Sequence, residues 1–154
     1  MRVLFLCTGN SCRSQMAEGW ARALKGGEIE AYSAGTSPHG VHPLAVRAMM
    51  EAGVDISGHV SKRPDEIDAS FDVVVTVCDA ASGACPSFPG ARVVHVGFDD
   101  PPRLAMGAGS DDEAMSHFRR VRDEIRAFVE TLPGAIAPAL SPDHQPPPTM
   151  ERIQ

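Results

Sequence analysis

Apolar residues follow two different periodicities along this chain. Four short segments, at residues 2–6, 29–33, 71–77 and 91–96, have the length and the apolar or β-branched content typical of buried strands. In residues 14–25, 43–52 and 110–132, apolar side chains recur instead at helical spacing along one face. Strands that alternate with helices indicate a four-stranded parallel sheet flanked by helices on both faces. The pattern therefore predicts an α/β fold.

Three loops directly follow predicted strands, at residues 7–14, 78–85 and 98–101. Parallel sheets bind ligands at the carboxyl ends of their strands, so we expect these loops to meet at one edge. Residues 97–110 show no regular period, which favours an extended surface loop. Ser110 and Glu113 form a capping-box pattern that predicts the start of the last helix.

The 154 residues suit a single domain. We expect this domain to span residues 1–134, because residues 135–154 are rich in proline and poor in apolar side chains. Such a tail is predicted to be mobile.

The net charge of −6 argues against a broad nucleic-acid surface, which needs clustered Lys and Arg. No apolar run approaches the roughly 20 residues that cross a bilayer, and no basic segment with a long apolar core opens the chain. We therefore expect neither nucleic acid nor membrane as a partner, and a cytoplasmic location. Four cysteines in such a protein favour reactive or metal-binding thiols over structural disulfides.

The segment CTGNSCRS, residues 7–14, lies between a predicted strand and a predicted helix. Such a loop can turn its backbone N–H groups inward around an oxyanion, toward which the next helix points its positive end. Arg13 adds a bidentate guanidinium, and Ser14 can donate a hydrogen bond to the thiolate of Cys7, the candidate nucleophile. The candidate substrate-binding residues are Thr8, Gly9, Asn10, Ser11, Cys12, Arg13 and Ser14.

A buried core cysteine is the alternative interpretation of Cys7, but the complete loop pattern favours the nucleophile. Asn10 is expected to be structural, since asparagine tolerates the left-handed backbone that a tight loop needs. Cys12 is either a packing residue, which we favour, or a disulfide partner that protects Cys7.

Asp99 and Asp100 follow the fourth predicted strand. A carboxylic acid at this place can protonate a leaving oxygen, whereas the alternative is a solvated acidic turn. Asp100 is the better candidate because the proline after it restricts its backbone.

Cys78 and Cys85 follow the third predicted strand and lack the C-x2-C spacing of structural zinc sites. Zinc binding by these two cysteines and His95 is a remote alternative. Two thiols on a flexible loop suit relayed exchange, in which one thiolate attacks a sulfur and the next resolves it.

Five segments carry a specific family pattern: CTGNSCRSQMAEGWA, YSAGTSPHGVHP, VVVTVCDAASGACP, GFDDP and FRRVRDEI. Through them, about residues 1–132 resemble the thioredoxin-coupled arsenate reductases, which are built on the low-molecular-weight tyrosine phosphatase fold. The resemblance implies that Cys7 attacks arsenate, for which phosphate or sulfate are mimics, while Arg13 holds the oxyanion and Asp100 acts as the acid. It also implies that Cys78 attacks the Cys7 adduct, and that Cys85 then forms with Cys78 a disulfide that thioredoxin reduces. No organic cofactor is implied.

Some members of this family hold a structural potassium ion, and two of the corresponding positions differ here. These positions are Val60 and Lys62, neither of which supplies a carboxylate or hydroxyl ligand. We therefore expect no metal, and we expect the Lys62 ammonium to lie near Glu18 in place of the cation.

Two other functions fit part of the pattern. The anion loop fits a low-molecular-weight protein tyrosine phosphatase equally well, but Asp100 is followed by PPRLA rather than by aromatic residues that grip a phenol ring. A non-catalytic phosphoryl carrier needs neither Arg13 nor Cys78 and Cys85. The sequence therefore favours arsenate reduction through a thiol relay.

Overall fold

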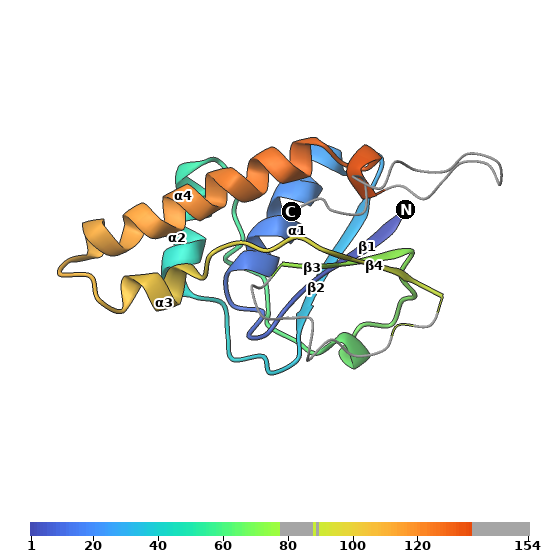
Figure 1. Cartoon of the computed structure of the whole chain (residues 1–154), viewed down its shortest axis with the longest axis horizontal. Helices are drawn as coiled ribbons and strands as arrows, with labels where there is room; N and C mark the ends of the chain where they lie inside the picture. Colours follow the sequence, from blue (N-terminus) through green and yellow to red (C-terminus); the bar gives the residue numbers. More distant parts are fainter. Residues whose placement is uncertain (78–87, 89, 137–154) are drawn as a thin grey trace.

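A four-stranded parallel sheet forms the centre of the molecule (Figure 1). The computed structural model describes residues 1–77, 88 and 90–136. Within them the strand order is β2-β1-β3-β4, and every neighbouring pair is parallel. The strands are β1 (Arg2–Cys7), β2 (Glu30–Gly35), β3 (Val73–Thr76) and β4 (Arg92–His95). The predicted α/β fold is confirmed.

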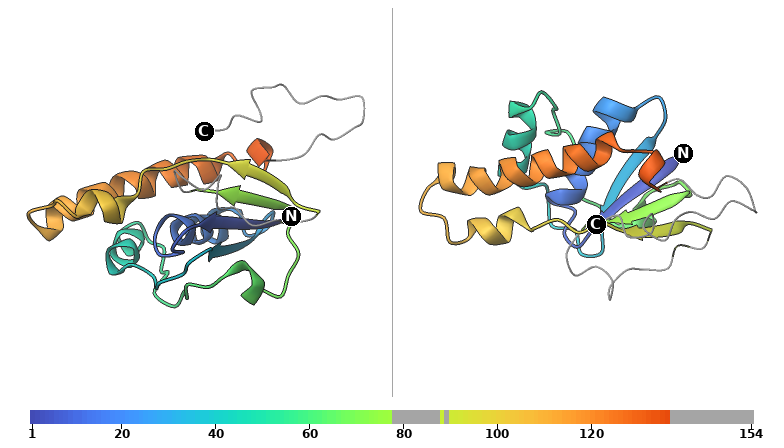
Figure 2. Two further views of the ribbon diagram at one scale, coloured as in Figure 1. Left: turned by 60° about the horizontal axis from the view of Figure 1, so that its bottom comes forward. Right: turned by 45° about the horizontal axis from the view of Figure 1, so that its top comes forward.

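The longest helix packs across the other helices on one side of the sheet (Figures 1 and 2). This helix, α4, contacts α1, α2 and α3. The helical elements are α1 (Arg13–Lys25), α2 (Pro43–Glu51), α3 (Pro101–Ala105), α4 (Asp111–Glu130) and the 3-10 helices η1 (Pro64–Glu66) and η3 (Gly134–Ile136).

The two faces of β1 belong to two apolar clusters because successive side chains of a strand point to opposite faces. Val3 and Phe5 are buried in the large core that α1, α2 and α4 complete. Leu4 and Leu6 are buried on the other face, where partly exposed Ile67, just after η1, packs against them. With no polar face, β1 has the continuous apolar sequence of a central parallel strand.

The expected surface loop after β4 is partly wrong, since Pro101–Ala105 forms the short helix α3. Prolines at its first positions have the backbone φ that a helix needs, but five residues are too few to show a helical period. The cap of α4 also differs from a complete capping box. Ser110 Oγ accepts the N–H of Glu113 at 3.2 Å, while the Glu113 carboxylate accepts from Gly109 at 2.9 Å.

The packed chain continues through η3, where Ile136 is fully buried in the large core. Residues 137–154 lie outside the described residues, so the predicted tail stays a prediction. None of the helices described here is long and apolar enough to cross a membrane.

Candidate active site

The anion loop, residues 7–13, connects the end of β1 to the start of α1 and is held from outside by residues 36–42. Its carbonyls accept backbone N–H groups of that segment: Cys7 from Thr36 at 3.3 Å, Thr8 from Ser37 at 2.8 Å, Gly9 from His39 at 3.1 Å and Ser11 from His42 at 2.8 Å. Because the C=O and N–H of one peptide plane point in opposite directions, these contacts turn the loop amides inward. Inward-pointing amides form a nest for an anion.

Cys7 is buried at the base of the loop, and its sulfur lies 2.9 Å from Ser14 Oγ. The side-chain amide of Asn10 donates to the same Ser14 oxygen at 2.8 Å. Since Ser14 accepts from Asn10, its own hydroxyl proton is available to the sulfur. This arrangement favours a hydrogen bond from Ser14 to a Cys7 thiolate, as the sequence predicts.

Asn10 anchors the loop and has the left-handed backbone predicted for it, with φ of 46°. Its side-chain oxygen accepts hydrogen bonds from Gln15 Nε2 and from the backbone N–H of Lys62, both at 3.0 Å. Its carbonyl accepts from the Ser61 hydroxyl at 2.5 Å. Asn10 therefore links the loop to the segment before η1.

Arg13 connects the anion loop to the loop that precedes α3. Its guanidinium donates to the carbonyl of Phe98 at 3.0 Å and lies 3.6 Å from Asp100 Oδ1. The Arg13 side chain is buried, whereas that of Asp100 is 30% exposed. The Asp100 carboxyl is therefore partly open to solvent and lies beside the side chain that would hold a substrate oxyanion.

Cys12 is the N-terminal residue flanking α1 and lies in the large apolar core. Burial raises the pKa of its thiol well above the usual value, and the nearby Cys7 raises it further. Cys12 is therefore a neutral packing thiol near neutral pH, whereas its predicted place among the substrate-binding amides is untested.

The buried Glu18 carboxylate accepts from the Ser33 hydroxyl at 2.5 Å and pairs with Arg22 at 2.8 Å. Lys62 Nζ donates instead to the carbonyl of Val60 at 3.0 Å. Among the described residues, Glu18 therefore pairs with Arg22, and Lys62 does not take the expected place beside it. In the part of the chain that the structure describes, no cluster of three or more His, Cys, Asp or Glu is placed to hold a metal ion.

The sequence interpretation missed the polar chain behind Asn10. His59 Nδ1 donates to the side-chain oxygen of Gln15 at 2.9 Å, and burial lowers the pKa of this histidine. Gln15 is fully buried. The sequence feature that could have indicated this network is Gln15 itself. A polar side chain next to the anion loop, at the start of a helix, needs hydrogen-bond partners when it is buried.

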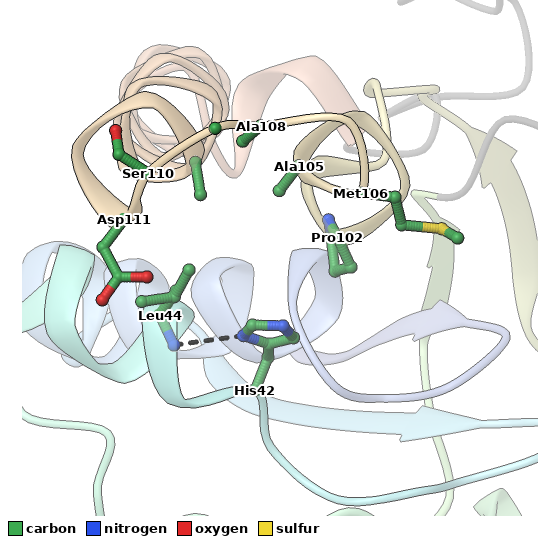
Figure 3. A pocket seen from close by; sticks show the side chains of 10 residues that line it. His42, Leu44, Pro102, Ala105, Met106, Ala108, Ser110 and Asp111 are labelled. Carbon is green, nitrogen blue, oxygen red and sulfur yellow. Dashed lines mark hydrogen bonds between the residues drawn. The ribbon is translucent and has the colours of Figure 1, made fainter.

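A cavity of about 490 Å³ lies between the start of α2 and the α3–α4 connection (Figure 3). His42 forms its floor, with Nδ1 accepting the backbone N–H of Leu44 at 3.1 Å. Pro102 and Ala105 of α3 face it from the other side. The segment predicted as a plain surface loop therefore forms one wall of this cavity.

The structure brings together Cys7, Arg13, Ser14 and Asp100 at the carboxyl ends of the strands. Cys78 and Cys85 lie outside the described residues, so their predicted roles stay predictions. His95, the third residue of the zinc alternative, has Nδ1 2.7 Å from the hydroxyl of Thr76.

Comparisons with known proteins identify the class that this fold and site define. Residues 2–140 match the low molecular weight phosphotyrosine protein phosphatase family, and the chain belongs to it. An arsenate reductase of Halalkalibacterium halodurans is 51% identical over 132 residues, which cover 84% of this chain and 93% of that protein. The predicted family is thereby confirmed.

Two solved structures are also similar. An arsenate reductase in its phosphate-binding state superimposes with a TM-score of 0.73 at 35% identity, over 88% of this chain and 98% of that one. A thioredoxin-dependent arsenate reductase of Corynebacterium glutamicum gives a TM-score of 0.59 at 26% identity, over 84% of this chain and 60% of that one.

Proposed function

We propose that this protein is an arsenate reductase that converts arsenate to arsenite, with Cys7 as nucleophile and thioredoxin as reductant. The observation that carries the proposal is the buried Cys7 sulfur, 2.9 Å from Ser14 Oγ at the base of an anion loop. The arsenate reductase relatives support the same activity. Its substrate is a tetrahedral oxyanion, which suits the inward-facing loop amides and Arg13.

In the first step, the Cys7 thiolate attacks arsenic. A sulfur–arsenic bond forms as the bond from arsenic to one of its hydroxyl oxygens breaks, and this leaving hydroxyl takes a proton from Asp100 and departs as water. Arg13 and the loop amides neutralise the oxygens that remain on arsenic. The proximity of the Asp100 carboxyl to Arg13, at 3.6 Å, supports this division of roles.

In the second step, the Cys78 thiolate attacks the sulfur of Cys7. The new disulfide forms as the sulfur–arsenic bond breaks, and that electron pair reduces As(V) to As(III), which leaves as arsenite. The strand register supports this partner, because Leu6 pairs with Thr76 and the N–H of Val77 donates to the Leu6 carbonyl at 2.9 Å. Cys78 is thus the residue that follows Val77 in the sequence, and Val77 contacts β1 at the residue before Cys7.

In the third step, Cys85 attacks Cys78 and releases Cys7 as a thiolate. Thioredoxin then supplies two electrons to the Cys78–Cys85 disulfide through its own dithiol. The thioredoxin-dependent relative from Corynebacterium glutamicum supports this reductant. A cytoplasmic location agrees with the relay, because the cytosol keeps thiols reduced.

The test is arsenate-dependent NADPH oxidation in the presence of thioredoxin and thioredoxin reductase, with arsenite measured directly. We expect no arsenite from Cys7→Ser or Cys78→Ser. Cys85→Ser should release arsenite once per enzyme molecule and then stop, because its Cys7–Cys78 disulfide has no resolving thiol. Repeated turnover by Cys85→Ser with thioredoxin would show that the relay is wrong.

A tyrosine phosphatase is the second candidate, because the family that matches this chain carries that description. Aryl phosphate hydrolysis, measured on the same preparations, separates the two. A kcat/KM for an aryl phosphate far above that for arsenate would favour the phosphatase, whose hydrolysis would not need Cys78 or Cys85.

A further inference from the structure

The imidazole of His39 lies directly against the anion loop at Gly9. A Cβ added to Gly9 would lie 2.7 Å from Cε1 and 2.8 Å from Cδ2 of this ring, closer than real side chains approach. The backbone N–H of His39 also donates to the Gly9 carbonyl at 3.1 Å. His39 therefore contacts the loop through both its backbone and its ring, and a side chain at Gly9 would force the ring out of this position.

The backbone around His39 is shaped for this contact. Gly40 has φ of +96°, a conformation that side chains rarely adopt, and a Cβ there would meet nothing within 4 Å. The glycine at this position is thus required by the turn rather than by crowding. Two glycines, Gly9 for close approach and Gly40 for the turn, allow the ring to reach the loop.

Gly9 immediately precedes Asn10, whose left-handed backbone and side chain lead to Ser14 and Cys7. A ring pressed against Gly9 limits how far this half of the loop can flatten. Since an anion nest depends on the direction of successive amides, a flatter loop would bind an oxyanion less well.

Histidine also adds a charge that varies near neutral pH. Among the described residues, the other ionisable groups around this part of the loop are Cys7 at the end of β1, Cys12 and Arg13 at the start of α1, His42 before α2 and Asp100 before α3. Burial lowers the pKa of His42, Asp100 raises it and His39 lowers it, so a charge on His39 is felt by its neighbours. The side chain of His39 is exposed to solvent.

We propose that His39 is a positioning residue for oxyanion binding: its ring keeps Gly9 in the curved form of the loop, and its protonated form attracts the anion. The identity of the natural anion rests on the proposed function. Inorganic phosphate is also a tetrahedral oxyanion, so its binding tests His39 without any turnover.

The experiment measures the Kd of inorganic phosphate for the reduced, full-length protein by titration calorimetry at about pH 6 and about pH 8, on either side of the usual histidine range. His39→Gln keeps a polar side chain but cannot gain a proton. We expect its phosphate Kd to exceed that of the wild type at both pH values because the ring is lost, and to do so by about three- to tenfold more at low pH, where the charge is lost as well. Because phosphate has the same ionisation state for both proteins at one pH, the ratio of their Kd values at that pH does not depend on it.

His117→Gln is the matched control, because His117 lies on α4 rather than against the anion loop. Its Kd should equal that of the wild type at both pH values. A His39→Gln effect of the same size at both pH values, or no effect, would overturn the electrostatic role of His39.

A second pair of variants tests the contact itself. Gly9→Ala should weaken phosphate binding because its methyl group meets the His39 ring, and adding His39→Gly should restore part of the affinity. No recovery in the double variant would overturn the steric role, provided that melting curves show both proteins folded. Arsenate turnover, measured in parallel, separates the proposal of arsenate reduction from the proposed role of His39. If the protein binds phosphate normally but does not turn over arsenate, the proposed function is contradicted and the role of His39 is unaffected.

Discussion

Asp99 and Asp100 are neighbours with different surroundings. Asp100 faces Arg13 of the anion loop at 3.6 Å, whereas Asp99 pairs with Arg120 of α4 at 3.0 Å and is 64% exposed. Exposed ion pairs contribute little to stability, typically about 0–1 kcal/mol. The two carboxylates therefore allow a direct comparison of a candidate acid with a surface residue of the same type.

We predict that Asp100→Asn lowers kcat for arsenate by about 100- to 10,000-fold, the usual contribution of a positioned acid. Asp99→Asn should change kcat by less than about twofold, since it removes only an exposed pair. Steady-state arsenite release in the thioredoxin-coupled assay measures both. Equal losses in the two variants would mean that Asp100 does not supply the proton.

At the scale of elements, the curvature of the anion loop depends on the end of β2. A Cβ on Gly35, the last residue of that strand, would lie 2.5 Å from the carbonyl oxygen of Thr8 and 2.7 Å from the backbone nitrogen of Asn10. Backbone atoms cannot yield as a flexible side chain does. Gly35 therefore lets two elements approach closely at the site.

We predict that Gly35→Ala destabilises the protein by about 1–3 kcal/mol, as overpacking does, and weakens phosphate binding at least tenfold. Gly27→Ala is the matched control, because a Cβ there meets nothing within 4 Å. Urea unfolding and phosphate titration give the two quantities. Wild-type phosphate affinity in a folded Gly35→Ala protein would contradict the role assigned to this glycine.

At the scale of the whole molecule, one core joins the sheet, α1, α2 and α4, and extends to Ile136 after the last long helix. Ile136 is fully buried. A chain that ended before it would expose part of this core. The boundary of the folded unit is thus a question of packing, which proline content alone does not decide.

We predict that a chain ending at residue 138 keeps the stability and the arsenate turnover of the full-length protein. A chain ending at residue 133 should lose about 2–5 kcal/mol, comparable to truncating a buried isoleucine to alanine. Thermal and urea unfolding of both proteins measure the difference. Equal stability of the two would show that η3 contributes nothing to the core, and a loss in the longer one would assign a structural role to the tail.

Particular residues show how far sequence reasoning reached. The first strand, predicted at residues 2–6 and one residue longer in the structure, and the left-handed Asn10 were predictable because local side-chain pattern and backbone preference decide them. The pairing of Glu18 with Arg22 was not predicted, although the two are four residues apart on α1. Lys62, which is distant in the sequence, was the expected neighbour of Glu18 instead. Helix α3 was missed because five residues carry too little pattern.

The sequence by itself determined the order of the four strands and of three of the helices, the loop from Cys7 to Arg13 between the first strand and the first helix, and the identity of the groups available for chemistry. Only the tertiary structure decided which groups meet: Arg13 with Asp100, Gln15 with His59, and the His39 ring with Gly9. The reason is physical. Periodicity and turn preferences act within about a dozen neighbouring residues, whereas these contacts join separate elements and exist only once the core has packed.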